Sequence, residues 1–241
     1  MEKRNRKFFA YKAVVFDLDG TLYFQKGLRR QMALRLLSYY GFHFWKVKEL
    51  FLLKDFRFVK EHWNEHIEKM KNSPSMEDIL SLNEQSVDKA QYLFVAKKYH
   101  TDPGIVERVV DKWIYADPLL ILKNHKDYEI ADLMVKLKEK GVQCLIFSDY
   151  PVEDKLKALE LSVDGCYSAT DSNINELKPS PKGLLTIMRE NQLAAKELLM
   201  VGDRMEKDGQ SAAAAGIDYL ILPSSRIERN QLYQKLYEEL E

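Results

Sequence analysis

Short apolar runs recur along the chain, and helical patterns lie between them. The runs cover residues 13–16, 142–147, 166–169, 198–201 and 219–222, and most are apolar throughout rather than alternating with polar positions. A strand covered on both faces has this uniform pattern, which is typical of parallel sheets. Because strand and helix alternate, the pattern predicts an α/β core with right-handed crossovers.

Helical periodicity marks the segments between these runs. Apolar positions recur at the spacing of one helix face in three of them: Ile130, Leu133, Met134 and Leu137; Val152, Leu156 and Leu159; and Leu184, Leu185, Ile187 and Met188. Gly141 predicts the end of the first of these helices. The stretch 225–241 mixes charges with Ile227, Leu232 and Leu236, and predicts a surface helix.

The alternation breaks over residues 24–123, where helical periodicity replaces the strand signals. A segment of this length without secondary structure would be exceptional inside a compact protein. We therefore expect an all-helical cap domain at 24–123, inserted into a Rossmann-like core at 1–23 and 124–241. The fold class is α/β, with a parallel core sheet flanked by helices.

Local signals inside the insertion predict its helices. Ser75 with Asp78 three residues later resembles a capping box, and Asp102 before Pro103 is typical of a helix start. One predicted helix face carries Leu28, Met32, Leu36 and Tyr40. We expect aromatic residues to fill the core of the insertion, among them Trp45, Phe51, Phe56, Phe58, Trp63 and Trp113.

Charge and cysteine content narrow the function classes. The chain has 241 residues and a net charge of zero, with 37 Lys and Arg against 37 Asp and Glu, so bulk attraction to nucleic acid is not expected. Cys144 and Cys166 are too few for a disulfide framework. Residues 1–12 are too short and too charged for a signal peptide or a spanning helix. We expect a cytoplasmic protein that binds neither nucleic acid nor membranes.

Two acids stand where the first apolar run ends. Asp17 and Asp19 follow the stretch 13–16 and precede Gly20 and Thr21. The carboxyl ends of parallel strands are where open α/β sheets hold their sites. Two carboxylates this close repel each other unless a cation or a shared proton offsets their charge. The run therefore points to a metal site.

Further polar residues stand at the predicted ends of other strands. Ser148 follows the run 142–147, and Asp203 follows the run 198–201 after one glycine. Lys178 lies before a proline, and Asp208 comes five residues after Asp203. Each signal is weak alone, because a serine at a strand end is commonly a helix cap. Their order on a parallel sheet is more specific.

In that order the residues resemble the four motifs of the haloacid dehalogenase superfamily. The run Asp17-Leu18-Asp19-Gly20-Thr21 resembles the first motif, Ser148 the second and Lys178 the third. Gly202-Asp203 with Asp208 resembles the fourth. The inserted helical domain lies between the first and second motifs, as does the helical type 1 cap of that superfamily.

The resemblance implies a Mg²⁺-dependent phosphatase that hydrolyses a small phosphorylated metabolite, such as a sugar phosphate or a phosphoglycolate-like ester. Asp17 would be the nucleophile and form an aspartyl-phosphate. Asp19 would protonate the leaving alkoxide and then deprotonate the hydrolytic water. The Mg²⁺ ligands would be the carboxylates of Asp17 and Asp203 and the backbone carbonyl of Asp19, with Asp208 acting behind them or through water.

The same resemblance supplies a phosphate-binding set. Ser148 would donate its hydroxyl to a phosphate oxygen, and Lys178 would pair with Asp17 and the phosphate. Backbone N–H groups near Leu18 and Asp149 would complete the cradle. Thr21 would hydrogen-bond to phosphate or to the backbone.

Two residues depart from the family pattern. Asp149 stands where members often carry Asn, and its charge would repel phosphate, so we expect it to point away or toward a cation. Arg204 follows Asp203 where smaller residues are common. An ion pair with Glu206 or Asp208 is the simpler expectation for Arg204, and an added charge beside the phosphate is the alternative.

Other activities stay open at this stage. Dehalogenases of the superfamily lack an acid at the position of Asp19, because a leaving halide needs no proton, so Asp19 argues for phosphate chemistry. A phosphomutase of the β-phosphoglucomutase type would use all of the same residues. A catalytically idle phosphate- or metal-binding module is a third reading, although Asp17, Lys178 and Asp203 are all present.

Overall fold

The computed structural model describes residues 2–3, 7–71 and 73–240. The chain forms two compact units. One contains residues 1–25 and 122–241 and the other residues 26–121.

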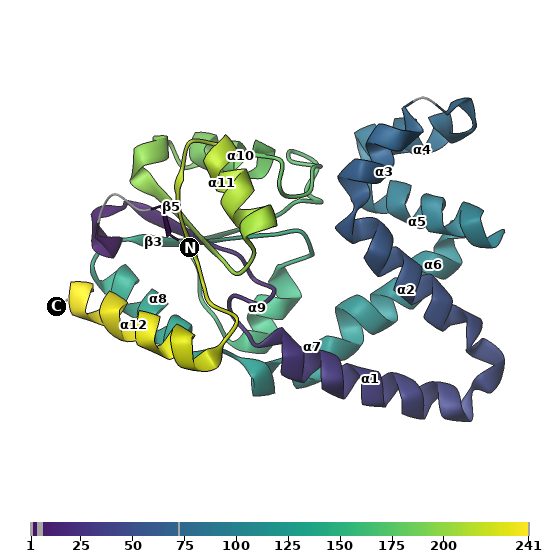
Figure 1. The fold of residues 1–241 in the computed structure, drawn as a ribbon, viewed down its shortest axis with the longest axis horizontal. Helices are drawn as coiled ribbons and strands as arrows, with labels where there is room; N and C mark the ends of the chain where they lie inside the picture. Colours follow the sequence, from purple (N-terminus) through teal and green to yellow (C-terminus); the bar gives the residue numbers. More distant parts are fainter. Residues whose placement is uncertain (1, 4–6, 72, 241) are drawn as a thin grey trace. The chain divides into compact units, whose positions relative to one another are not determined.

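The first unit is built on a six-stranded sheet in the order β1-β6-β5-β2-β3-β4 (Figure 1). Among the described residues, five strands run parallel, and the short β1 pairs antiparallel with β6. The parallel strands agree with the predicted runs to within one residue. The sequence pattern did not reveal β1. The strands are β1 (Glu2–Lys3), β2 (Ala13–Phe16), β3 (Gln143–Ser148), β4 (Gly165–Ser168), β5 (Leu198–Gly202) and β6 (Asp218–Ile221).

Strand β2 occupies the centre of the sheet, between β5 and β3. All four of its residues are buried, and Phe16 pairs with Ile146 on one side and Val201 on the other. The chain leaves β2 in one direction toward β3 and β4, and later returns to add β5 and β6 on its other side. The carboxyl end of β2 is therefore the point where strand order reverses, which is where open α/β sheets bind ligands.

Helices cover both faces of this sheet. In Figure 1, α8 and α12 lie on one side, and α10 and α11 lie on the other. Gly141, in the left-handed region at φ +80°, follows the end of α8 as predicted. The helices are α8 (Tyr128–Glu139), α9 (Glu153–Leu159), α10 (Lys182–Glu190), α11 (Gln210–Ala214) and α12 (Arg226–Leu240).

The buried faces of two of these helices differ from the prediction. In α10, Leu184 and Ile187 are buried as expected, but Leu185 is exposed. In α12, Leu236 is buried as expected, whereas Ile227 is exposed and Arg229 and Tyr233 are buried. A helix face selected by apolar residues alone misses a buried arginine, because Arg229 is held there by polar partners.

The second unit is helical. Asp102 caps α6 by accepting a hydrogen bond from the backbone N–H of Gly104 at 2.8 Å, as predicted. The predicted capping box is wrong, since α4 begins at Glu77 and the Ser75 hydroxyl contacts the Ser73 hydroxyl instead. The helices are α1 (Gln25–Phe42), α2 (Lys48–Glu61), α3 (Trp63–Met70), α4 (Glu77–Gln85), α5 (Val87–Tyr99), α6 (Pro103–Val110) and α7 (Asp117–Leu122).

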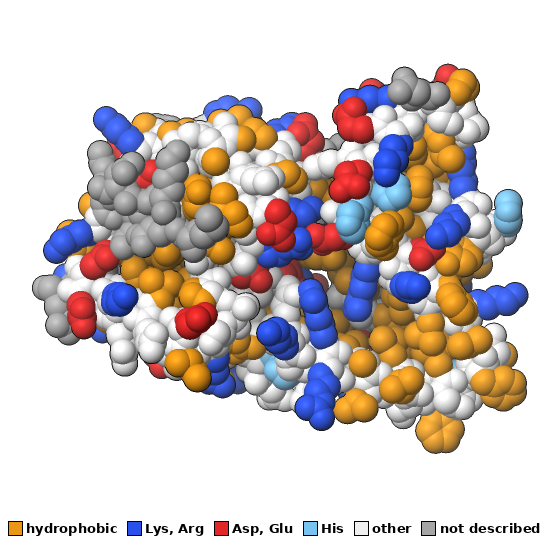
Figure 2. All heavy atoms as spheres, viewed as in Figure 1, with side chains coloured by type: hydrophobic (Ala, Val, Ile, Leu, Met, Phe, Trp, Pro, Cys, Tyr) orange, Lys and Arg blue, Asp and Glu red, His pale blue; other side chains and the backbone are white. Residues whose placement is uncertain are grey.

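Half of the aromatic residues expected in the core of this unit are there. Phe56, Trp63 and Trp113 are buried, whereas Trp45, Phe51 and Phe58 are more than half exposed. Figure 2 shows apolar side chains gathered on the surface over α1 and α2. Among the described residues, no helix has the length and apolar character needed to cross a membrane.

Candidate active site

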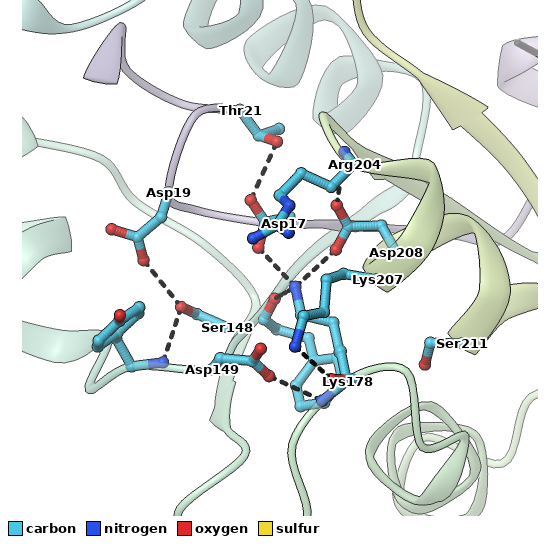
Figure 3. Close-up of polar contacts among 12 residues, drawn as sticks. Asp17, Asp19, Thr21, Ser148, Asp149, Lys178, Arg204, Lys207, Asp208 and Ser211 are labelled. Carbon is cyan, nitrogen blue, oxygen red and sulfur yellow. Dashed lines mark hydrogen bonds and ion pairs between the residues drawn. The ribbon is translucent and has the colours of Figure 1, made fainter. Parts of the chain in front are cut away.

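The first residue of the site is Asp17, directly after β2. Its backbone N–H donates to the carbonyl oxygen of Val201 at 2.8 Å, which extends the pairing with β5 and fixes the Asp17 backbone. Its side chain is buried, with one carboxylate oxygen 2.6 Å from Lys178 Nζ. The other oxygen accepts from the Thr21 hydroxyl at 3.1 Å (Figure 3). Thr21 therefore contacts the aspartate itself.

Lys178 joins Asp17 to a second acid. Its Nζ lies 2.6 Å from a carboxylate oxygen of Asp17 and 2.6 Å from one of Asp208. Burial alone would lower the pKa of Lys178, but the charges of the two aspartates raise it well above its ordinary value. Lys178 is thus a permanent cation, held against the predicted nucleophile.

Three carboxylates crowd together at this end of the sheet. Asp17, Asp203 and Asp208 each offer an oxygen, and these oxygens all lie within 4.8 Å of one another. Burial raises the pKa of Asp17 well above its ordinary value, and the charges of Asp208 and Asp203 add to this rise against the effect of Lys178. One lysine therefore does not neutralise the cluster.

Asp203 provides a direct test of whether the cluster fits a cation. Its Oδ1 is buried and has no hydrogen-bond partner among the described residues. Burial and the charge of Asp208 raise the pKa of Asp203 to about 6. Carboxylate oxygens are the ligands that Mg²⁺ prefers, and Asp203 offers one without a partner in a cluster of three carboxylates. The residues present therefore fit the predicted metal.

Gly20 allows Asp203 its position. Gly20 has φ +101°, and a Cβ added there would lie 2.2 Å from Asp203 Oδ2. Any side chain at this position would be strained and would displace the carboxylate. The glycine of the first motif and the aspartate of the fourth are thus packed against each other.

Asp19 lies in a different environment from Asp17. Its Oδ1 accepts from Lys155 Nζ at 2.5 Å and from the Tyr23 hydroxyl, and its Oδ2 accepts from the Ser148 hydroxyl at 3.1 Å. Burial alone would raise the pKa of Asp19, but the ammonium of Lys155 and the three hydrogen bonds hold that pKa below its ordinary value. The environment therefore raises the pKa of Asp17 and lowers the pKa of Asp19, the two acids of the first motif.

The loop after β3 carries the predicted phosphate-binding residues. The Ser148 hydroxyl, besides contacting Asp19, accepts from the backbone N–H of Tyr150 at 3.1 Å. The Asp149 carboxylate accepts from the backbone N–H of Lys178 at 2.9 Å. Asp149 thus points to the Lys178 loop, and its contact there is a backbone amide rather than a cation. The Leu18 side chain is buried, so only its backbone is available to a ligand.

Asp208 and Arg204 are each held by an ion pair, Asp208 with Lys178 and Arg204 with Glu206. Asp208 is buried, with one oxygen on Lys178 and the other accepting from the backbone N–H of Arg204 at 3.1 Å. The Arg204 side chain forms an ion pair with Glu206 at 2.8 Å, the simpler of the two expectations for it. Lys207 Nζ donates to the carbonyl oxygen of Lys178 at 3.1 Å.

Besides Lys207, sequence reasoning missed three residues that touch this site. Lys155 and Tyr23 both contact Asp19, and Arg229 donates to the carbonyl oxygen of Gly20 at 2.9 Å. A signal for Lys155 was present, because it shares the helix face of Val152 and Leu159 and interrupts that apolar stripe. Tyr23 follows Asp19 by four residues, beyond the end of the motif.

Comparison with known proteins decides the family. A model of haloacid dehalogenase-like hydrolases matches residues 11–216. The chain belongs to this family. It is therefore a hydrolase, and the predicted resemblance to the haloacid dehalogenase superfamily is confirmed. A comparison with curated proteins found no match.

Solved structures of the family share the fold. A 2-haloacid dehalogenase from Pseudomonas syringae pv. Tomato DC3000 has 15% identity and a TM-score of 0.57, with 88% of this chain and 86% of that one covered. A predicted phosphoglycolate phosphatase from Haemophilus somnus 129pt has 20% identity and a TM-score of 0.53, with 88% and 85% covered. The HAD-hydrolase candidate YfnB from Bacillus subtilis, solved with magnesium, has 16% identity and a TM-score of 0.55, with 94% and 98% covered. At these identities the likeness shows the fold alone.

Proposed function

We propose that this hydrolase is a Mg²⁺-dependent phosphatase that acts on a small phosphorylated metabolite through an aspartyl-phosphate on Asp17. The observation that carries the proposal is Asp19, whose carboxylate accepts a hydrogen bond from Ser148, the predicted phosphate ligand. A leaving alkoxide needs a proton, whereas a leaving halide does not. An acid at this place has a task in phosphate ester hydrolysis and none in dehalogenation.

The first step transfers the phosphoryl group to Asp17. A carboxylate oxygen of Asp17 attacks phosphorus, the P–O bond of the ester breaks, and its electron pair stays on the leaving oxygen. That oxygen takes a proton from the Asp19 carboxyl and leaves as the alcohol. The negative charge of a bound phosphate would raise the pKa of Asp19 and so favour its protonated form.

The second step regenerates the enzyme. A water oxygen attacks phosphorus and gives a proton to the Asp19 carboxylate, while the bond from phosphorus to Asp17 breaks. The products are inorganic phosphate and free Asp17. The lowered pKa of Asp19 in the structure without ligand favours the carboxylate that accepts this proton, whereas the first step needs the protonated acid that a bound phosphate would favour.

The remaining residues bind and neutralise the phosphate. Lys178, buried and cationic, would approach a phosphate oxygen while holding Asp17. Ser148, Thr21 and the backbone N–H groups of Leu18 and Asp149 would complete the cradle. Positioning and charge neutralisation account for most of the rate in phosphoryl transfer.

The metal site would be formed by the carboxylates of Asp17 and Asp203 and the backbone carbonyl of Asp19, with Asp208 close behind. When bound there, Mg²⁺ would offset the repulsion between an anionic nucleophile and an anionic phosphate. The unpartnered oxygen of Asp203 supports this assignment.

The deciding experiment compares two reactions of the purified protein. Hydrolysis of p-nitrophenyl phosphate is measured with Mg²⁺ and with a chelator, beside halide release from 2-chloropropionate. Asp17→Asn serves as the blank, and Asp154→Asn, on an exposed side chain, is the matched control. Phosphate release that needs both Mg²⁺ and Asp17 supports the proposal. Halide release that needs Asp17, without phosphate release, would replace the proposal with dehalogenation.

A further inference from the structure

The Asp19 carboxylate is held unequally at its two oxygens. Oδ1 takes two donors, Lys155 Nζ at 2.5 Å and the Tyr23 hydroxyl, whereas Oδ2 takes only the Ser148 hydroxyl at 3.1 Å among the described residues. The Lys155 and Asp19 side chains are 9% and 15% exposed, so water screens their ion pair weakly. One oxygen is thus anchored, and the other is shared with the predicted phosphate-binding loop.

We propose that Lys155 is a positioning residue that fixes Asp19 Oδ1, so that Oδ2 carries the proton exchanged with the leaving group. This inference rests on the proposed phosphatase function and adds to it the atom that transfers the proton. Ser148 is the common neighbour of Oδ2 and of a bound phosphate. When the Ser148 hydroxyl turns to a phosphate oxygen, Oδ2 loses its donor and faces the ester, while Oδ1 stays anchored.

The position of Lys155 in the fold supports this role. It lies in the first turn of α9, whose neighbouring residues Val152, Leu156 and Leu159 are buried. The buried residues hold the helix in place, and the helix in turn holds the Lys155 ammonium group beside Asp19. Lys157, two residues further along, faces the opposite way, with an exposed side chain that pairs only with Asp154 at 3.0 Å.

The charge of Lys155 also suits the product of the first step. When Asp19 gives up its proton it becomes a carboxylate next to a buried ammonium group, which stabilises it. This stabilisation speeds the reaction most when the leaving group is strongly basic, because such a group must be fully protonated to depart. The effect on the rate is smallest for a leaving group such as p-nitrophenolate, which departs with little help.

The test uses two aryl esters that differ only in a para nitro group, p-nitrophenyl phosphate and phenyl phosphate. Each is measured with wild type, Lys155→Met, Lys155→Arg and the matched control Lys157→Met. The value of kcat/KM is compared because it includes the departure of the leaving group. We expect Lys155→Met to lose about 10- to 100-fold more on phenyl phosphate than on p-nitrophenyl phosphate. Lys155→Arg should recover part of this difference, and Lys157→Met should leave both esters unchanged.

Equal losses on the two esters, or none, would overturn the proposal, because a merely structural lysine has no preference for leaving groups. Crystal structures of wild type and Lys155→Met provide a readout that needs no turnover. The Asp19 carboxylate should rotate away from its wild-type position in the variant, and an unmoved carboxylate would also overturn the proposal. If wild type hydrolyses neither ester, the proposed function fails, and these structures still decide whether Lys155 orients Asp19.

Discussion

Arg229 Nη2 donates a hydrogen bond to the carbonyl oxygen of Gly20 at 2.9 Å and so ties helix α12 to the turn of the first motif. The same guanidinium contacts Asp127 at 3.2 Å, and both side chains are buried. The Tyr233 hydroxyl donates to the same Asp127 oxygen at 3.0 Å. The last helix of the fold thus supports the backbone that carries Asp17 and Asp19.

Removing this arginine should destabilise the protein strongly. Arg229→Met leaves the Asp127 carboxylate buried without its cation, which costs about 3–5 kcal/mol in free energy of unfolding. Urea unfolding measures the loss. Arg226→Met, on the exposed first turn of the same helix, is the matched control and should change stability by no more than about 0.5 kcal/mol. Equal stability of the two variants would contradict the buried ion pair.

Replacing the glycine of the first motif should damage the site more than the fold. In Gly20→Ala, the new methyl group would meet Asp203 Oδ2 at 2.2 Å and the residue would keep a positive φ. We expect phosphate ester turnover to fall by at least about 10²-fold. Thermal stabilisation by Mg²⁺, measured by the change in Tm, should be lost as well.

The matched control for this change is Gly41→Ala, in helix α1. A Cβ at Gly41 meets nothing within 4 Å, and alanine in a helix is up to about 1 kcal/mol more favourable than glycine. Gly41→Ala should therefore keep full turnover and be slightly more stable. If Gly20→Ala retained both turnover and the Mg²⁺ response, Asp203 would not need its present position.

The acid cluster predicts a pH dependence of stability in the metal-free protein. The pKa of Asp203 is raised to about 6 in the folded state, whereas the ordinary pKa of an aspartate in an unfolded chain is 3.8. Between these values the folded state binds more protons, so raising the pH through this window lowers stability. Added Mg²⁺ should oppose the loss, because it favours the ionised carboxylate.

Urea unfolding with a chelator, from below pH 3.8 to above pH 6, tests this sign against Asp203→Asn. The variant lacks the titrating group and retains its neighbours, so the difference between the two proteins isolates Asp203. As the pH rises, the free energy of unfolding of the wild type should fall relative to that of Asp203→Asn. If the stability of the wild type relative to the variant stayed constant or rose with pH, the raised pKa of Asp203 would be contradicted.

The strands and the motif residues could be predicted because their signals are local. Each parallel strand is apolar over its whole length, and Asp17, Ser148 and Asp203 stand at strand ends that meet at one edge of the sheet. The sequence could therefore place these residues without knowledge of their contacts. The capping box failed because Ser75 finds a local hydroxyl partner that competes with the helix.

The contacts of the supporting residues could not be predicted because their partners lie far along the chain. Lys155 is 136 residues from Asp19, and Arg229 is 209 residues from Gly20. A lysine or an arginine on a helix face is ordinarily solvated, and only its tertiary partner shows that it is buried. Asp149 was expected to point away from the phosphate or toward a cation, and its observed partner, the backbone N–H of Lys178, likewise comes from a distant loop.

Asp149 itself provides a prediction that separates its hydrogen bond from its charge. Its oxygen accepts from the Lys178 backbone N–H at 2.9 Å and so holds the loop that carries the lysine. Asp149→Asn keeps an accepting oxygen and removes a negative charge that would repel phosphate. Turnover of p-nitrophenyl phosphate should therefore stay within about threefold of wild type, without a rise in KM.

Asp149→Ala removes the acceptor as well and leaves the N–H of Lys178 unpaired. It should lower kcat by about tenfold and cost about 1–3 kcal/mol of stability. Asp154→Ala, an exposed acid in the following helix, should change neither quantity. If Asn were as harmful as Ala, the charge of Asp149 would matter more than its hydrogen bond. The lysine loop would then depend on electrostatic attraction between Asp149 and the Lys178 ammonium, whose pKa that charge raises.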